Sequence, residues 1–360
     1  MLTFEQYINE QRIDELSSDL LKRAAIAAKN RNDGKVDART RRFEKAAIDA
    51  LKREIAQSEI DTTDMPASKN TQKYELYKQE GDLWRIRALK DIKLSSGNII
   101  KAGTLGGLVV SENNLSQDGT CWIFEDAKVY DDAKVYGNAN VYGGAEVYGS
   151  AKVYDEAKVY WFAEVYDNAE VHGNAKVCDS KVYNNANVSG NAYSDKSKIY
   201  GSAQVYDNAK VFNAGQVYDH ATVYGDAKVN SNAWVYGNAK IYDNADIENA
   251  KVYENAKVCG KAYICDSANI FGDAEVYENA KVNDRAKVYG EAKVYGEAWI
   301  SDNAKVYGNA IVYGKAMVYG NAKVFDNAKV YGNAKVYGNA MVYGKAKVSN
   351  DDKVDTTELY

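Results

Sequence analysis

Residues 326–348 read DNAKVYGNAKVYGNAMVYGKAKV, a six-residue unit repeated almost without change. In each unit we number Ala as position one, Lys two, Val three, Tyr four, Gly or Asp five and Asn six. The same phase extends from Ile123 to Val354. Self-similarity at a short fixed period is the sequence signature of a solenoid, so the repeat decides the architecture before residue propensities do.

The residue types of the unit predict a short strand followed by a bend. Positions one and three are apolar and flank a charged position two, so a strand would direct Ala and Val to one face and Lys to the other. Gly, Asp and Asn at positions five and six tolerate a positive φ at the least steric cost, and they predict a bend after every unit. Three such bends close a triangular coil of about 18 residues.

We therefore predict a mainly β protein, a single-stranded parallel β-helix whose coils hydrogen-bond to the coils above and below. Residues 123–354 would make about 13 coils, stacked about 4.8 Å apart. Ala at position one suits the crowded corner, and β-branched Val at position three suits stacked strands. The chain contains one Pro, which fits this fold because Pro removes a backbone donor from any coil that it enters.

Four further segments are predicted outside the repeat. Residues 1–57 form two amphipathic helices, because apolar residues recur there at three- and four-residue spacing. Residues 58–72 are polar, contain the single Pro and are expected to be a linker. Residues 73–122 form a hairpin that turns at 80–82, followed by a Gly-rich cap over the first coil. Residues 355–360 are a short tail beyond the pattern.

Composition and charge exclude some function classes. The chain has 360 residues, 46% of them hydrophobic, with 46 basic and 51 acidic residues and a net charge of −5. Because the two signs are interspersed, we expect no nucleic-acid groove. There is no apolar run of about 18 residues and no signal-peptide core, so we expect no membrane segment and synthesis in the cytoplasm.

The four cysteines are scattered through the repeat. Cys121 takes the inward position one, and Cys178, Cys259 and Cys265 replace Tyr at position four. This spacing fits no metal site, and free thiols are expected in a reducing compartment. We expect no metal and no cofactor, since the sequence also lacks a phosphate-binding loop and a nucleophile elbow.

The phase of the repeat slips by one residue at 177–182, 194–199 and 247–252. Each slip leaves a unit of five residues instead of six. We interpret these units as shortened corners of the coil, and the alternative is a recess used for binding.

Tyrosine dominates the aromatic residues, with 30 Tyr against seven Phe. Equivalent positions of successive coils lie one strand spacing apart, so the position-four rings are predicted to stack in ladders. We interpret the ladders first as stiffening of the rod, and alternatively as a platform for a glycan or a protein face. The candidate binding residues, taken from the two densest runs, are Tyr142, Tyr148, Tyr154, Tyr307, Tyr313 and Tyr319.

A family resemblance covers residues 83–354. The segments LWRIRALKD (83–91), KAGTLGGLV (101–109) and NLSQDGTCWI (114–123) resemble the lead-in of hexapeptide-repeat proteins of bacteria and phages that are described as putative transferases. Those proteins belong to the trimeric acyltransferase-like superfamily of left-handed β-helices. The resemblance implies left-handed coiling, a homotrimer, and acyl transfer to a sugar or amine by a His at the junction of subunits.

Two histidines are available for such a reaction. His172 stands in a Tyr place at position four, and His220 stands in an Asn place at position six. Both lie in otherwise ordinary units with no inserted loop nearby. We interpret them as exposed substitutions and keep them as the candidate catalytic residues of the alternative reading.

The opening residues, MLTFEQYINEQ (1–11), resemble the N-terminal targeting segments of head and internal proteins of T4-type tailed phages. That resemblance implies cleavage after Glu10 by a prohead protease, because residues 8–10 fit its Leu/Ile-x-Glu pattern. It also implies location in a phage virion. The apolar stripes of the N-terminal helices would then bind a protein partner.

The sequence thus predicts a non-catalytic rigid β-solenoid, phage-encoded, that acts as a structural, adaptor or binding element. Two alternatives stay open. A hexapeptide-class acyltransferase requires a base that reaches its substrate in a dry cleft. A carbohydrate-binding rod would use the Tyr ladders with the Asn and Asp residues beside them.

Overall fold

The computed structural model describes residues 72–360. The helices predicted over 1–57, the linker up to its last residue and the Glu10 cleavage site lie outside the described residues. The chain divides into two units, one formed by residues up to 80 with 84–106, the other by 81–83 and 107–360. Within the described part of the chain, no helix is long and apolar enough to cross a membrane.

Before the coils, the chain forms a β-hairpin. Strands β1 (Tyr74–Glu80) and β2 (Leu83–Ala88) pair with each other, and the chain reverses at residues 81–82, within the turn predicted at 80–82. Gly81 has φ +63°, a conformation that Gly adopts without steric cost. A second, antiparallel pair is formed by β3 (Ile92–Lys93) and β4 (Ile99–Ile100).

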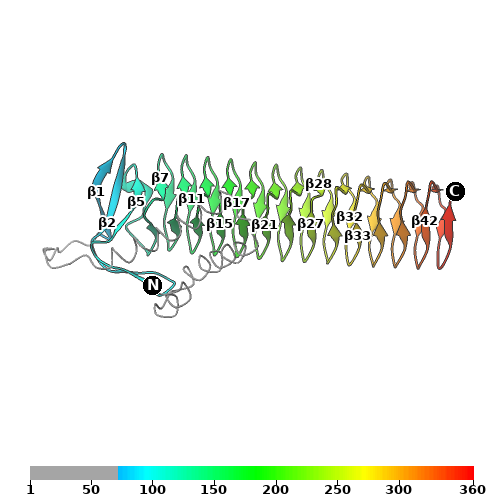
Figure 1. Ribbon diagram of the computed structural model, residues 1–360, viewed down its shortest axis with the longest axis horizontal. Coiled ribbons are helices and arrows are strands. Elements are labelled where there is room, and N and C mark those ends of the chain that lie inside the picture. The colour runs from blue at the N-terminus through cyan, green and yellow to red at the C-terminus, as the bar shows by residue number, and fades with distance from the viewer. Residues whose placement is uncertain (1–71) are drawn as a thin grey trace, which may run out of the picture. The chain divides into compact units, whose positions relative to one another are not determined.

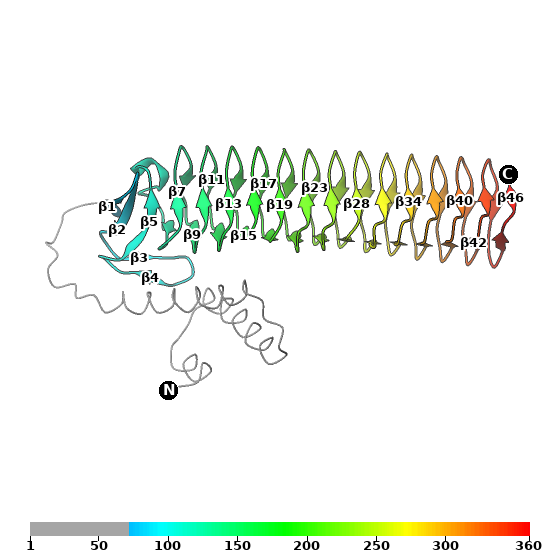
Figure 2. The same cartoon turned by 45° about the horizontal axis from the view of Figure 1, so that its top comes forward.

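The second unit is a parallel β-solenoid of about 14 turns, which confirms the predicted fold (Figures 1 and 2). Each strand pairs in parallel with the strand one coil further on, as Val147 does with Val165, 18 residues away. The unit contains more coils than the roughly 13 expected. β6 begins before the repeat, and β46 extends strand pairing beyond Val354 into the predicted tail.

Face 1 of the triangular coil is the sheet that begins where β5 (Leu105–Val109) pairs with β7. Its coil strands are β7 (Lys128–Val129), β10 (Glu146–Val147), β13 (Glu164–Val165), β16 (Lys181–Val182), β19 (Lys198–Ile199), β22 (Gln216–Val217), β25 (Trp234–Val235), β28 (Lys251–Val252), β31 (Asn269–Ile270), β34 (Lys287–Val288), β37 (Lys305–Val306), β40 (Lys323–Val324), β43 (Met341–Val342) and β46 (Glu358–Leu359).

Face 2 follows face 1 along the chain. Its strands are β8 (Lys134–Val135), β11 (Lys152–Val153), β14 (Glu170–Val171), β17 (Asn187–Val188), β20 (Gln204–Val205), β23 (Thr222–Val223), β26 (Lys240–Ile241), β29 (Lys257–Val258), β32 (Glu275–Val276), β35 (Lys293–Val294), β38 (Ile311–Val312), β41 (Lys329–Val330) and β44 (Lys347–Val348).

Face 3 completes each coil. Its strands are β6 (Trp122–Ile123), β9 (Asn140–Tyr142), β12 (Lys158–Tyr160), β15 (Lys176–Cys178), β18 (Tyr193–Asp195), β21 (Lys210–Phe212), β24 (Lys228–Asn230), β27 (Asp246–Glu248), β30 (Tyr263–Ile264), β33 (Lys281–Val282), β36 (Trp299–Ile300), β39 (Met317–Val318), β42 (Lys335–Tyr337) and β45 (Lys353–Asp355).

A short 3₁₀ helix, η1 (Glu112–Asn114), precedes β6. The Ser111 side chain accepts from the Asn113 amide, and the Asn114 side chain accepts from the Ser111 amide, which together cap the helix. Asn114 Nδ2 also donates to the carbonyls of Asp131 and Ala133 at 3.0 and 2.9 Å. The helix is therefore tied to the coil that follows it.

The core of the solenoid is the column of position-one and position-three side chains, as the alternation predicts. Ala145 and Val147 are fully buried, and so are nearly all their equivalents along the rod. Position five takes the left-handed conformation at the corners, with φ 67° at Gly149 and 57° at Asp167. Gly and Asp recur there because few other residues tolerate that conformation.

The five-residue units all lie at one corner, between face 3 and face 1. They connect β15 to β16, β18 to β19 and β27 to β28, and across each one the strand register shifts by 17 residues instead of 18. A fourth unit of this kind connects β45 to β46. Each is a corner shortened by one residue.

Candidate functional site: the position-four columns

Position four of face 1 is aromatic in every coil. The column consists of Tyr130, Tyr148, Tyr166, Tyr183, Tyr200, Tyr218, Tyr236, Tyr253, Phe271, Tyr289, Tyr307, Phe325, Tyr343 and Tyr360. Up to Tyr343, successive rings stack nearly parallel at centroid distances of 4.8–5.1 Å. Both faces of each interior ring are thus covered by neighbouring rings, and only ring edges and hydroxyl groups meet solvent.

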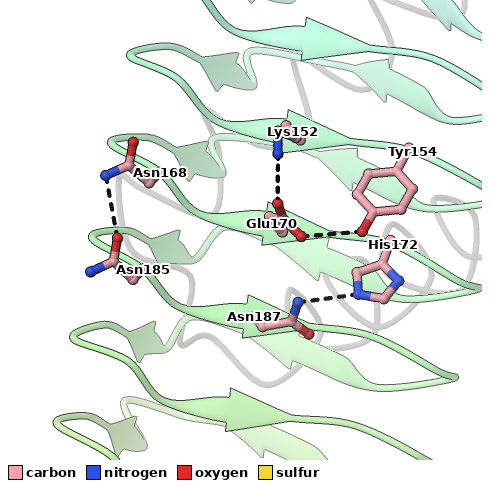
Figure 3. A network of polar contacts seen from close by, with 7 residues as sticks. All are labelled: Lys152, Tyr154, Asn168, Glu170, His172, Asn185 and Asn187. Carbon is pink, nitrogen blue, oxygen red and sulfur yellow. Dashed lines mark hydrogen bonds and ion pairs between the residues drawn. The ribbon is translucent and has the colours of Figure 1, made fainter.

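The hydroxyl groups of these tyrosines point toward the position-two residue of the next coil. Tyr130 and Tyr154 donate their hydroxyls to Glu146 and Glu170 at 3.1 and 3.2 Å. Figure 3 shows Glu170 between Tyr154 and Lys152. The Lys152 Nζ atom lies 2.9 Å from the Glu170 Oε1 atom. The Lys152 hydrogen bond holds the pKa of Glu170 below its usual value, and burial with the nearby Glu170 charge raises the pKa of Tyr154 to about 12.

The tyrosines that are neighbours in the sequence stand on different faces. Tyr142, Tyr148 and Tyr154 belong to faces 3, 1 and 2, and each stacks on a ring one coil away. The same holds for the second set, which the structure distributes over faces 1, 2 and 3 in the order Tyr307, Tyr313 and Tyr319. Because one unit spans only a third of a coil, neither set forms a single patch.

The position-four column of face 2 is interrupted. It consists of Tyr136, Tyr154, His172, Ser189, Tyr206, Tyr224, Tyr242, Cys259, Tyr277, Tyr295, Tyr313, Tyr331 and Ser349. Single non-aromatic residues with a ring on either side occur at Ser189 and Cys259. Stacking is continuous between these breaks, as between Tyr206 and Tyr224 at 5.1 Å.

His172 forms one rung of this column. Its ring stacks on Tyr154 at 4.7 Å with an interplanar angle of 0°, and Asn187 Nδ2 lies 3.1 Å from Nε2 (Figure 3). On the other side, Nδ1 lies 3.7 Å from Asp155 Oδ2. His220 lies three coils further on, exposed at a corner between faces 1 and 2, where its amide donates to the Gly237 carbonyl at 2.9 Å. The structure does not bring the two histidines together.

In the middle of face 3, most position-four residues are Cys or polar residues in place of Tyr, with Phe212 as the exception. Its position-four column consists of Phe124, Tyr142, Tyr160, Cys178, Asp195, Phe212, Asn230, Glu248, Cys265, Asn283, Ser301, Tyr319, Tyr337 and Asp355. Tyr263 donates to Glu248 at 2.6 Å, and Asn230 Nδ2 donates to Asp246 at 2.8 Å. Burial raises the pKa of the Cys265 thiol to about 12, so this thiol stays protonated at neutral pH.

The sequence analysis did not find that most non-aromatic position-four residues lie on face 3. Face membership depends on counting every third unit across the slips in phase, and a one-residue error moves a side chain to another corner. The strand register would have identified this column, because it pairs Cys178 with Asp195 and Asp195 with Phe212.

None of the four cysteines, all within residues 72–360, is in a disulfide, and these residues contain no group of three or more His, Cys, Asp or Glu side chains suited to a metal ion. Surface depressions occur at the corners. One of about 420 Å³ is lined by Asn191, Asn208, Lys210, Asp226, Lys228 and Asn244, and two others lie at further corners. Neither histidine lines any of these three depressions.

Two stretches of the solenoid match a known family model, the YdcK beta solenoid repeat, at residues 304–320 and 334–350. No curated protein sequence matches the chain. The matched stretches lie in the coils where the six-residue unit is most regular. Together with the parallel coils, the match establishes that this chain is a β-solenoid repeat protein.

Proposed function

We propose that this chain is a rigid, non-catalytic rod that serves as a spacer or adaptor in a phage particle, attached through its N-terminal residues to a protein partner. One observation carries the proposal. From β7 to β46, successive strands of face 1 are always 17 or 18 residues apart, so no loop leaves the coil to wall a substrate site. A reaction center would need such walls to exclude water from the reacting groups.

The ladders support stiffness of this rod. Each interior ring of face 1 contacts one ring above and one below, and a stacked pair contributes about 0.5–1.5 kcal/mol beyond area burial. The backbone adds hydrogen bonds between coils at every unit, as from Tyr148 N to Val165 O at 3.0 Å. In a solenoid these nearest-neighbour terms resist bending along the whole length.

The rival reading is an acyltransferase of the hexapeptide class that acts through His172 or His220. Wild type and the His172→Ala/His220→Ala double variant would be assayed for acetyl transfer from acetyl-coenzyme A to amino sugars. The rod proposal expects no turnover in either form. Turnover in the wild type that the double variant loses would overturn it in favour of the enzyme.

The N-terminal part of the proposal rests on the resemblance of residues 1–11 to phage targeting segments. Mass spectrometry of purified particles tests it directly. We expect the protein in the particle with a new N-terminus at Gln11. Its absence from particles would remove the phage role, and sedimentation of the purified chain would separately test the homotrimer that the hexapeptide resemblance implies.

A further inference from the structure

Ser189 interrupts a column of stacked rings for the length of one coil. The strands on either side are in register, with Val171 paired to Val188 and Val188 paired to Val205. Ser189 therefore stands between His172 and Tyr206 in the face 2 column, where every neighbouring unit of the ladder places a ring. Because the coil spacing is unchanged, the rings of His172 and Tyr206 are two coil spacings apart. The space between their facing surfaces is the space that one stacked aromatic ring occupies elsewhere in the ladder.

Each of the two rings beside Ser189 stacks on another ring on the side that faces away from Ser189. His172 stacks on Tyr154 and is bonded to Asn187 at 3.1 Å, while Tyr206 stacks on Tyr224 at an interplanar angle of 7°. These contacts fix the two walls at the ladder spacing. The Ser189 hydroxyl makes no side-chain hydrogen bond with any residue that the structure describes. It therefore does not link the two rings across the space between them.

A hydrogen-bond partner is also in place. Where the ladder is complete, Tyr154 donates its hydroxyl to Glu170, which is at position two of the following coil. The residue in that relation to Ser189 is Gln204, which is exposed at position two of β20. Its amide oxygen can accept a hydroxyl hydrogen bond from a ring at the Ser189 level.

We propose that the Ser189 level is a binding site for one free phenol ring, stacked between His172 and Tyr206 with its hydroxyl donated to Gln204. This site is independent of the rod function proposed above. A sugar ring is thicker than an aromatic ring because hydrogens project from both its faces, so it does not match an interval set by aromatic stacking. A tyrosine side chain would direct its main chain toward Ser189, where the rod's own backbone lies.

The second single interruption, at Cys259, also lies between two rings that stack on rings behind them, but it differs from Ser189 in two respects. The Tyr242 hydroxyl lies against the Cys259 thiol, a contact that raises the pKa of Tyr242. The position-two residue of the next coil is Glu275, which already binds Lys257 and Lys293, each at 3.1 Å. We therefore assign the phenol to Ser189 alone, with one ring bound per chain.

Equilibrium dialysis of phenol against the full-length protein tests the assignment. Two stacked contacts and one hydrogen bond predict millimolar affinity with a stoichiometry of one. Gln204→Leu should weaken binding about tenfold, which corresponds to about 1.4 kcal/mol for a lost hydrogen bond. Ser189→Gly should bind phenol more tightly than wild type, because it removes the Ser189 hydroxymethyl group from the space between the His172 and Tyr206 rings.

Ser189→Tyr completes the ladder and should abolish binding while raising the melting temperature. The matched control is Ser349→Tyr, which adds a ring at the end of the same column and should leave phenol binding unchanged. Methyl glucoside and N-acetyltyrosinamide should not bind. The proposal is overturned if wild type binds no phenol, if folded Ser189→Tyr binds as wild type does, or if N-acetyltyrosinamide competes for the site. Should Ser189→Tyr not fold, Gln204→Leu and Ser189→Gly decide the question by themselves.

Discussion

The carboxylate of Asp131 accepts a hydrogen bond from the backbone amide of Gly149, one coil further on, at 3.1 Å. The amides of positions four and six donate to carbonyls of the next coil, as Tyr148 and Ser150 do. The position-five amide of Gly149 instead donates to a side chain of the previous coil. An Asp there supplies the acceptor. The same bond recurs in the pairs Asp155–Gly173, Asp207–Gly225, Asp219–Gly237, Asp243–Gly260 and Asp326–Gly344.

Replacing Asp131 with Ala removes the acceptor for the Gly149 amide. Because this corner is exposed and water can take the carboxylate's place, we expect a loss of about 0.5–1.5 kcal/mol in unfolding free energy. Asp131→Asn is the matched control, since Asn184 Oδ1 fills the same role toward Gly201 at 3.3 Å. Urea unfolding would measure both variants, and equal losses for Ala and Asn would contradict this role for the carboxylate oxygen.

Tyr218 lies inside the face 1 ladder, with ring centroids 4.8 Å away on both sides. Tyr218→Ala removes two stacked contacts and should lower the unfolding free energy by about 1–3 kcal/mol. Tyr218→Phe keeps the ring and should be nearly neutral, as Phe271 and Phe325 stack within the same column. Hydrogen exchange should show the loss confined to the coils next to Tyr218, because each coil contacts only its neighbours.

Three serines are buried near the shortened corners. Ser194 stands at a position that is Val in most units. Its hydroxyl oxygen lies 2.7 Å from that of Ser197, and the Ser197 hydroxyl oxygen lies 3.4 Å from that of Ser180. Ser197→Ala should cost about 1–3 kcal/mol, because it leaves the buried Ser194 hydroxyl without that partner. The double variant Ser194→Val/Ser197→Ala restores the repeat residues and should be at least as stable as wild type. A double variant less stable than Ser197→Ala would show that the hydroxyls do not act as a pair.

The ladders should make the rod sensitive to alkali. Burial, with nearby carboxylates, raises the pKa values of Tyr148 and Tyr277 to about 12, from an ordinary value of 10.0. The folded protein then holds these protons more tightly than the unfolded chain, so their stabilising effect is complete below pH 10 and is lost as the pH rises from 10 toward 12. Circular dichroism melts across this range should show a falling melting temperature, and Tyr148→Phe/Tyr277→Phe should show a shallower fall.

The repeat by itself determined the coil. Alternation of Ala, a charged residue and Val sets the inward and outward faces, and a residue that tolerates positive φ sets each corner, so both follow from local chemistry. The stacking of position-four rings also follows, because every coil repeats the same spacing.

Only the tertiary structure decided which residues share a face. Strand pairing between coils joins residues 17 or 18 apart, and each shortened corner moves all later side chains by one place. Rules that consider only neighbouring residues therefore do not assign a side chain to its column. That is why Tyr142, Tyr148 and Tyr154 separate onto three faces, why His172 becomes a rung of a ladder, and why Ser189 stands between two rings. These relationships come from stacking of distant segments, which the six-residue unit does not contain.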